Sequence, residues 1–226
     1  MKNFLELPQA FISTDENNFG LVIAGGRKPE AAWLKEASTN KKIFCADRGI
    51  EVALENKLVP ELLLGDCDST DENFYKEAER LGVKIFRHPI AKDDTDLQLL
   101  LKSLPEANYI FTGIWGGRFD HLYANVFSLL NFKLQIENEI ILADEKEIML
   151  LASTKENYSI KLKAKPKAIS LLPLSDSCTV SIKNVRWELE EKNLNLLEPY
   201  AISNEAMGEE FTFHCSRGSC GLYLVF

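Results

Sequence analysis

Hydrophobic and polar residues follow two different patterns along this chain of 226 residues. In the first part, short apolar runs typical of buried strands alternate with amphipathic stretches that have helical spacing. The predicted strands are 19–24, 42–46, 61–64, 83–87 and 109–112. The predicted helices are 30–37, 50–56, 71–81, 95–104 and 120–132, with Ser69 and Asp94 as candidate N-caps. Strict alternation of strands and helices predicts a parallel sheet with right-handed crossovers.

The pattern changes after about Asp144, where strand-like runs follow one another with no convincing helix between them. These runs are 149–152, 158–163, 168–174, 179–183, 210–215 and 222–226. Turn residues such as Lys165-Pro166 and Ser175-Asp176 separate them. The sequence therefore predicts an α/β fold in two domains. Residues 1–145 form a Rossmann-like parallel-sheet domain with helices on both faces, and residues 146–226 form an all-β, sandwich-like domain.

Net charge, the lengths of the apolar runs and the number of cysteines argue against several classes of protein. The formal net charge of -8, from 34 acidic and 26 basic residues, argues against a nucleic-acid-binding protein. The N-terminal stretch lacks the order of a signal peptide, and no apolar run reaches membrane-spanning length. The cysteines are odd in number and lack metal-type pairing, which favours reduced thiols in the cytoplasm: Cys45, Cys67, Cys178, Cys215 and Cys220.

Unusual residue clusters follow each of the five predicted parallel strands. Because the loops after parallel strands converge on one edge of a sheet, where ligands of such folds bind, these clusters should lie together. In chain order they are Ala24 to Arg27, Asp47 to Gly49, Gly65 to Ser69, Lys92 to Asp96 and Gly116 to His121. The sequence therefore predicts a polar site at this edge.

Two aspartates in the third cluster have a spacing suited to a metal ion. Asp66 and Asp68 can face one hard cation from a tight loop, with Gly65 relieving the backbone. Taken alone, the segment also fits an ordinary solvated turn. Further carboxylates are expected on the same edge: Asp93, Asp96 and Asp120. Repulsion among so many uncompensated carboxylates favours a bound cation such as Mg²⁺.

Cations and glycines beside these aspartates suit phosphate groups. Lys92 and Arg118 are the expected point-charge and bidentate phosphate partners, although each could also be an ordinary surface cation. Gly25-Gly26 fits close approach of a phosphate or a simple turn. The chain contains neither a Walker-type loop nor a G-x-G-x-x-G segment, so P-loop and dinucleotide-binding interpretations lack support.

Two further residues have both a chemical and a structural interpretation. His121 could act as a general base or contact a phosphate, and it could equally be structural at a helix start. Cys67 lies between two candidate metal ligands, but no neighbouring histidine activates it as a nucleophile, which favours packing.

Three motifs, in this order and spacing, resemble the motif set of thiamine pyrophosphokinases. They are Gly65 to Ser69, Lys92 to Asp96 and Gly117 to His121. The resemblance extends to Asp47-Arg48-Gly49, to Ile202-Ser203-Asn204-Glu205 and to Trp187, where the family carries an aromatic residue. It departs at Cys67, where the family often has Phe, and the closing strands match only loosely.

The resemblance implies Mg²⁺-dependent transfer of a pyrophosphoryl group from ATP, as co-substrate, to thiamine. It implies a homodimer whose sites lie between the α/β domain of one subunit and the β domain of the other. Asp66, Asp68 and Asp96 would bind Mg²⁺, with Asp93 as a further catalytic carboxylate. Contacts with ATP would come from Gly25, Gly26, Asp47, Arg48, Lys92, Thr95, Gly117, Arg118, Asp120 and His121. Thiamine would lie against Trp187, Ser203 and Asn204.

Other interpretations of the same residues stay open. A metal-dependent phosphohydrolase would use the aspartates to activate water rather than to orient an alcohol. A sensor would bind thiamine or a nucleotide without turnover, although simple binding would not need so many carboxylates. Without the family match, Trp187 fits the hydrophobic core as well as a stacking site.

Overall fold

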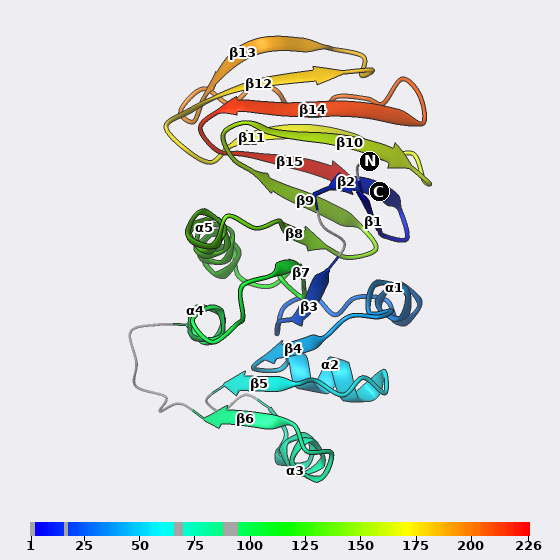
Figure 1. The fold of residues 1–226 in the computed structure, drawn as a ribbon, viewed down its shortest axis with the longest axis vertical. Helices are drawn as coiled ribbons and strands as arrows, with labels where there is room; N and C mark the ends of the chain where they lie inside the picture. The colour runs from blue at the N-terminus through cyan, green and yellow to red at the C-terminus, as the bar shows by residue number, and fades with distance from the viewer. Residues whose placement is uncertain (1–2, 16–17, 66–69, 88–94) are drawn as a thin grey trace. The chain divides into compact units, whose positions relative to one another are not determined.

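The computed structural model of the protein describes residues 3–15, 18–65, 70–87 and 95–226, and Figure 1 shows its elements along the chain. The chain forms two compact units. We call residues 18–140 the parallel-sheet unit, and residues 1–17 together with 141–226 the β unit. The fold is mixed α/β with large sheets, as the sequence predicts. In the described ranges, no helix is both long and apolar enough to span a membrane.

Five parallel strands build the sheet of the parallel-sheet unit, in the order β7-β3-β4-β5-β6 (Figure 1). They are β3 (Phe19–Ile23), β4 (Ile43–Ala46), β5 (Leu62–Gly65), β6 (Lys84–Arg87) and β7 (Asn108–Thr112). Every residue of β3, β4, β5 and β7 is buried, which explains why these segments are continuous apolar runs. The predicted parallel pairing is confirmed.

Five helices alternate with these strands. They are α1 (Ala31–Ala37), α2 (Gly49–Glu55), α3 (Glu72–Arg80), α4 (Asp96–Leu101) and α5 (Phe119–Ile136). The predicted N-caps at Ser69 and Asp94 are wrong. Helix α3 is capped by Asp71 and α4 by Thr95, because a capping oxygen must come from the residue next to the first helical one.

Strands are added to this sheet on both sides of β3. From β3 the chain moves outward to β4, β5 and β6, and it then returns to place β7 on the other side of β3. Right-handed crossovers consequently assign α1, α2 and α3 to one face and α4 and α5 to the other. In agreement, α2 contacts α3 and α4 contacts α5. The carboxyl ends of β3 and β7 therefore flank a topological switch point, where sheets of this kind bind ligands.

The β unit is antiparallel. One sheet has the order β1-β2-β10-β14-β12-β13, and β11-β15-β9-β8 follow one another in a second sheet. Their bounds are β1 (Asn3–Glu6), β2 (Ala10–Thr14), β8 (Ile140–Ala143), β9 (Glu147–Ala152), β10 (Glu156–Leu162), β11 (Ala168–Pro173), β12 (Ser177–Lys183), β13 (Leu189–Asn195), β14 (Glu210–Arg217) and β15 (Cys220–Val225).

The N-terminal residues belong to the β unit, whereas the sequence places them in the first domain. The reason is strand pairing far along the chain: β2 pairs antiparallel with β10, with Ile12 opposite Ile160. Both side chains are buried, at 1 % exposure. The chain therefore passes from one unit to the other at about residues 17 and 141, and the β unit is assembled from two separate segments.

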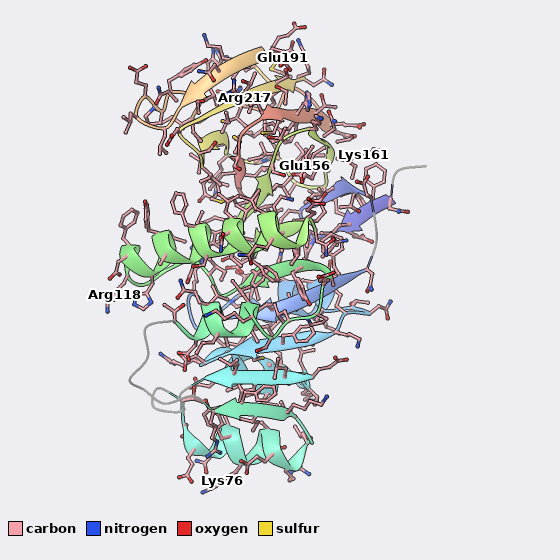
Figure 2. All side chains as sticks on the ribbon, turned by 60° about the vertical axis from the view of Figure 1, so that its left-hand side comes forward. Lys76, Arg118, Glu156, Lys161, Glu191 and Arg217 are labelled. Carbon is pink, nitrogen blue, oxygen red and sulfur yellow. The ribbon has the colours of Figure 1, made fainter. Side chains whose placement is uncertain are left out.

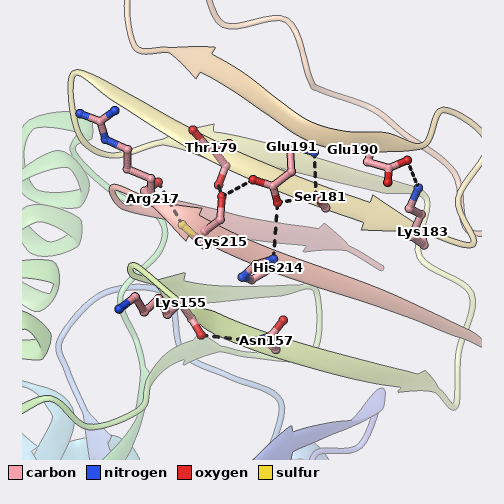
Figure 3. A network of polar contacts seen from close by, with 11 residues as sticks. Lys155, Asn157, Thr179, Ser181, Lys183, Glu190, Glu191, His214, Cys215 and Arg217 are labelled. Carbon is pink, nitrogen blue, oxygen red and sulfur yellow. Dashed lines mark hydrogen bonds and ion pairs between the residues drawn. The ribbon is translucent and has the colours of Figure 1, made fainter.

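A polar network covers the outer face of β12, β13 and β14 (Figure 3). The Glu191 carboxylate accepts hydrogen bonds from Ser216 Oγ at 2.8 Å and Ser181 Oγ at 3.2 Å, and it lies 3.7 Å from His214 Nδ1. Glu191 has φ 41°, and the pairing register shifts opposite it, so its backbone N–H also reaches Ser181 Oγ at 2.9 Å. These contacts attach the exposed edge strand β13 to the rest of its sheet.

Candidate active site

The loops that follow the parallel strands carry the residues expected at the site. The structure describes four parts of this set: the glycines after β3, the Asp47 loop after β4, the start of α4 and the loop from β7 into α5. Several predicted site residues lie outside the described residues: Asp66, Asp68, Lys92 and Asp93, together with Cys67.

A cavity of about 520 Å³ lies at the carboxyl ends of β3, β4 and β7. The predicted residues that line it are Gly25, Gly26, Asp47, Thr95, Asp96, Gly117, Arg118 and His121. Leu97, Ile114 and Asn125 line it as well and were not predicted. Asn125 follows His121 by four residues on α5, so a helical i, i+4 pattern extended from His121 is the signal that could have found it.

Glycines at the floor of the cavity are required by close backbone contact. Gly26 N–H donates to Gly113 O at 2.7 Å, and a Cβ on Gly26 would lie 2.4 Å from that oxygen. Gly113 has φ 71°, and its own Cβ would lie 2.2 Å from Ala24 O. The loops after β3 and β7 thus touch through bare backbone, which leaves room above them for a large ligand.

Asp47 reaches the cavity from a strained backbone conformation. Its φ is 49°, in the left-handed region that non-glycine residues rarely adopt, at a cost of about 1–3 kcal/mol. Its N–H donates to Leu64 O at 2.9 Å, and a Cβ on Gly65 would lie 3.2 Å from the Asp47 Cα. The Asp47 turn therefore packs directly against the end of β5, where the Asp66 to Ser69 segment begins.

The start of α4 places a second carboxylate at the cavity. Thr95 caps the helix: its Oγ1 accepts from Gln98 N–H at 3.3 Å, and Gln98 Oε1 accepts from Thr95 N–H at 2.9 Å. Gln98 Nε2 also donates to Ser128 Oγ on α5 at 3.0 Å. This reciprocal capping box fixes Asp96 as the first helical residue, with its side chain half-buried at the cavity wall.

Arg118 lies at the start of α5 (Figure 2), and Asp120 holds it there. Arg118 Nε and Nη2 donate to the two Asp120 oxygens at 3.0 and 2.5 Å. This bidentate hydrogen bond lowers the pKa of the Asp120 carboxyl below its ordinary value. Arg118 and His121 line the cavity whereas Asp120 does not, so Asp120 orients the arginine. Arg48 also lies outside the lining and pairs with Glu51 at 3.7 Å.

The cavity presents two described carboxylates, Asp47 and Asp96, and one guanidinium, Arg118. Carboxylate oxygens suit a hard cation, and a guanidinium suits a phosphate. In the described part of the chain, no group of three or more His, Cys, Asp and Glu side chains is positioned to hold a metal ion. The two carboxylates fit Mg²⁺, which proteins commonly bind through one or two carboxylates together with water and substrate phosphates.

The β unit carries a second cavity, of about 420 Å³, lined by Trp187, Glu188, Leu189, Tyr200, Ala201, Ile202 and Asn204. Trp187 is 53 % exposed, which excludes the alternative that it belongs to the core. Ser203 does not line the cavity, and its N–H donates to Ser170 Oγ at 3.1 Å. Trp187 and Asn204 are therefore brought together as predicted, and Tyr200 and Ile202 are additional members.

Two family models match this chain. Residues 34–142 match the model described as thiamin pyrophosphokinase, catalytic domain, and residues 157–220 match thiamin pyrophosphokinase, vitamin B1 binding domain. Together they span well over half of the chain. The first match covers most of the parallel-sheet unit and all of the cavity lining except Ala24, Gly25 and Gly26, and the second covers Trp187 and Asn204.

Individual relatives agree with the family models. The chain is 27 % identical over 203 residues to thiamine pyrophosphokinase of Bacillus subtilis, covering 87 % of this chain and 94 % of the relative. It is 27 % identical over 157 residues to thiamin pyrophosphokinase 1 of Caenorhabditis elegans, covering 65 % of this chain and 62 % of the relative. The crystal structure of the B. subtilis protein superposes with a TM-score of 0.79 at 24 % identity, covering 92 % and 99 % of the two chains. Thiamin pyrophosphokinase from Candida albicans gives 0.77 at 16 % identity, covering 92 % and 89 %. These two structural likenesses show a shared fold.

Proposed function

The chain belongs to the thiamin pyrophosphokinase family, and from this premise we propose that it transfers the pyrophosphoryl group of ATP to the hydroxyl of thiamine in a Mg²⁺-dependent reaction. The products are thiamine diphosphate and AMP. One observation carries the proposal: Asp47, Asp96 and Arg118 line a single cavity at the switch point of a parallel sheet. Its bare glycine floor accommodates a polyphosphate without side chains in the way.

In the proposed site, carboxylates bind the metal ion and cationic side chains bind the phosphates. Mg²⁺ bound to ATP supplies positive charge to the phosphate oxygens. Asp66, Asp68 and Asp96 hold that ion, with Asp47 and Asp93 beside them. Arg118, oriented by Asp120, binds phosphate oxygens from the α5 side, and Lys92 acts as a second cation. The remaining nucleotide contacts come from the loops after β3 and β4 and from Thr95 and His121.

The oxygen of the thiamine hydroxyl attacks the β-phosphorus of ATP, and its proton is released to water. The bond between the β-phosphorus and the oxygen that bridges to the α-phosphorus breaks, and AMP leaves with the electrons of that bond. Negative charge develops on phosphate oxygens in this step, and Arg118 and Lys92 offset it. The capping box at Thr95 fixes the position of the Asp96 carboxylate, and the Asp47 turn fixes that of Asp47. The protein therefore acts mainly by positioning the substrates and neutralising the charge of the phosphates.

The same proposal extends to architecture and location. The parallel-sheet unit serves as a Rossmann-like ATP domain, and the β unit serves as a sandwich-like thiamine domain. We place the enzyme in the cytoplasm, where reduced thiols persist: among the described residues, Cys45, Cys178, Cys215 and Cys220 are buried and form no disulfide.

A product assay tests the reaction. Purified protein with ATP and Mg²⁺ should release AMP only when thiamine is added, in equal amount to thiamine diphosphate. A metal-dependent phosphohydrolase would release AMP or phosphate without thiamine, and a sensor would bind both ligands with no product. Either of those results would overturn the proposed transfer.

Trp187→Ala should raise the thiamine KM by roughly 5- to 30-fold, because removal of a stacking and cation–π partner costs ~1–2 kcal/mol. The ATP KM and kcat should change little, since the lost contact binds the ground state and the transition state equally. Steady-state kinetics with each substrate varied in turn would measure both constants. An equal rise in both KM values would remove Trp187 from the thiamine side of the site.

We also propose a homodimer with shared sites, since the ATP cavity belongs to one unit and the Trp187 cavity to the other. At thiamine concentrations well below the raised KM of Trp187→Ala, where both homodimers turn over slowly, mixing Asp96→Asn subunits with Trp187→Ala subunits should then raise the activity, because each heterodimer contains one site with neither substitution. Random pairing makes half the dimers mixed, so recovery should approach about a quarter of the wild-type activity. Heterodimers that form without any recovery would contradict shared sites.

A further inference from the structure

The exposed indole of Trp187 is held by neighbours on both its backbone and its ring. Its backbone N–H donates to Asn204 Oδ1 at 3.1 Å, and its backbone carbonyl accepts from Asn204 Nδ2 at 2.7 Å. Asn204 Oδ1 also accepts from Glu205 N–H at 2.9 Å. Both acceptor positions of this oxygen are therefore filled, and the Asn204 amide chiefly brackets the Trp187 backbone.

Arg186 contacts the ring itself. Its guanidinium carbon lies 4.8 Å from the centroid of the Trp187 ring, within the range of a cation–π contact. The guanidinium is in turn held by Glu205, because Arg186 Nη1 lies 3.2 and 3.3 Å from the two carboxylate oxygens. The backbones are also joined, since Arg186 N–H donates to Glu205 O at 2.9 Å. Glu205, Arg186 and Trp187 thus form one continuous stack.

We propose that Arg186 and Glu205 are positioning residues that set the orientation of the Trp187 ring and leave one ring face open to the substrate. This inference rests on the proposed function, because it concerns the thiamine half of the site. The guanidinium occupies one face of the indole, and the ring lines the cavity. A free tryptophan side chain would lose rotamer freedom when a ligand stacks on it, whereas a ring already fixed loses little.

Alternative roles for the pair fit the geometry less well. A simple surface ion pair needs no aromatic partner, yet Arg186 lies over the ring while it contacts Glu205. The side chains of Arg186 and Glu205 are 56 % and 45 % exposed, so their pairing adds little to stability by itself. Its consequence should therefore be visible in thiamine binding rather than in unfolding.

Two variants with near-isosteric side chains test the proposal: Arg186→Met, which keeps an apolar stem, and Glu205→Gln. Each should raise the thiamine KM by about 3-fold, the size of a partly exposed cation–π contact, with the ATP KM and kcat unchanged within twofold. The double variant should be no worse than either single one, because both residues act through one ring. Arg186→Lys should give partial rescue, since it keeps the charge without the planar fork.

Acrylamide quenching of tryptophan fluorescence gives a readout that does not depend on turnover. Trp33 and Trp115 are 3 % and 4 % exposed, so quenching reports mainly on Trp187. Its quenching constant should rise in Arg186→Met and Glu205→Gln and stay at the wild-type value in Arg217→Met, the same exchange at another exposed arginine of the β unit.

The outcomes separate the two proposals. Unchanged quenching together with an unchanged thiamine KM in both variants would overturn the positioning role. A thiamine KM and an ATP KM that rise together would also overturn it. Failure of the unsubstituted protein to make thiamine diphosphate would overturn the proposed function instead, and the quenching comparison would still decide whether Arg186 and Glu205 fix the ring.

Discussion

Asp96→Asn should lower the turnover of ATP and thiamine by roughly 100-fold or more while leaving the fold intact. The amide keeps the shape of the side chain and removes the negative charge that a Mg²⁺ ligand needs. The cost to stability is small: Asp96 is the first residue of α4, where a carboxylate interacts with the helix dipole by only about 0.3–1 kcal/mol. Steady-state kinetics at several Mg²⁺ concentrations, with a thermal melt, would measure both effects.

Asp176→Asn is the matched control, because it makes the same exchange at an exposed turn of the β unit. It should keep wild-type kinetics. Near-normal turnover of Asp96→Asn at ordinary Mg²⁺ concentrations would remove Asp96 from the metal site. Recovery only at high Mg²⁺ would instead agree with weakened metal binding, which is the effect expected when one of several ligands is lost.

The parallel-sheet unit could be predicted in detail because four of its five strands, β3, β4, β5 and β7, are buried on both faces. A strand such as Leu62–Gly65 is an uninterrupted apolar run, and the amphipathic segments between such runs can only be helices packed on the sheet. Parallel pairing then brings every following loop to one edge. That single topological argument predicts Gly26, Asp47, Asp96 and Arg118 at one edge of the sheet, and all four line one cavity in the structure.

The β unit was predicted less well, because some of its strands lack a hydrophobic pattern. β13 (Leu189–Asn195) is mostly polar and exposed, and its pairing with β12 and the Glu191 hydrogen bonds hold it in place. β1 and β2 are short; β1 pairs with β2, and β2 pairs with β10, which lies more than a hundred residues away in sequence. No local signal in the sequence reports contacts of that kind.

Residue roles at Trp187 were also beyond the reach of sequence. The Ile202 to Glu205 motif points to this region. The sequence does not indicate that the Asn204 amide hydrogen-bonds to the Trp187 backbone or that Glu205 binds Arg186. Such roles depend on the directions of side chains across two neighbouring segments. They emerge only once the isolated bridges between Ile169 and Asn204 and between Val185 and Ala206 fix the register.

Gly113→Ala should lower the stability of the protein by about 3–5 kcal/mol. Two costs add at this position. Gly113 has φ 71°, a conformation that costs an alanine about 1–2 kcal/mol. The new Cβ would also lie 2.2 Å from Ala24 O, and neither partner is a flexible side chain that can move aside. The backbone must shift, which disturbs the hydrogen bond from Gly26 N–H to Gly113 O at 2.7 Å.

A comparison with Gly82→Ala separates these two costs. Gly82 has φ 78°, almost the same backbone conformation, but nothing lies within 4 Å of its Cβ position, and it follows α3 away from the cavity. Gly82→Ala should therefore lose only about 1–2 kcal/mol, or roughly 2–8 °C in Tm, against about 10 °C for Gly113→Ala. Gly113→Ala should also bind ATP more weakly in the fraction that remains folded, because the floor of the cavity moves with the backbone. Equal losses of Tm in the two variants would mean that the φ angle alone is responsible, and that the loops after β3 and β7 tolerate a wider separation than their contact implies.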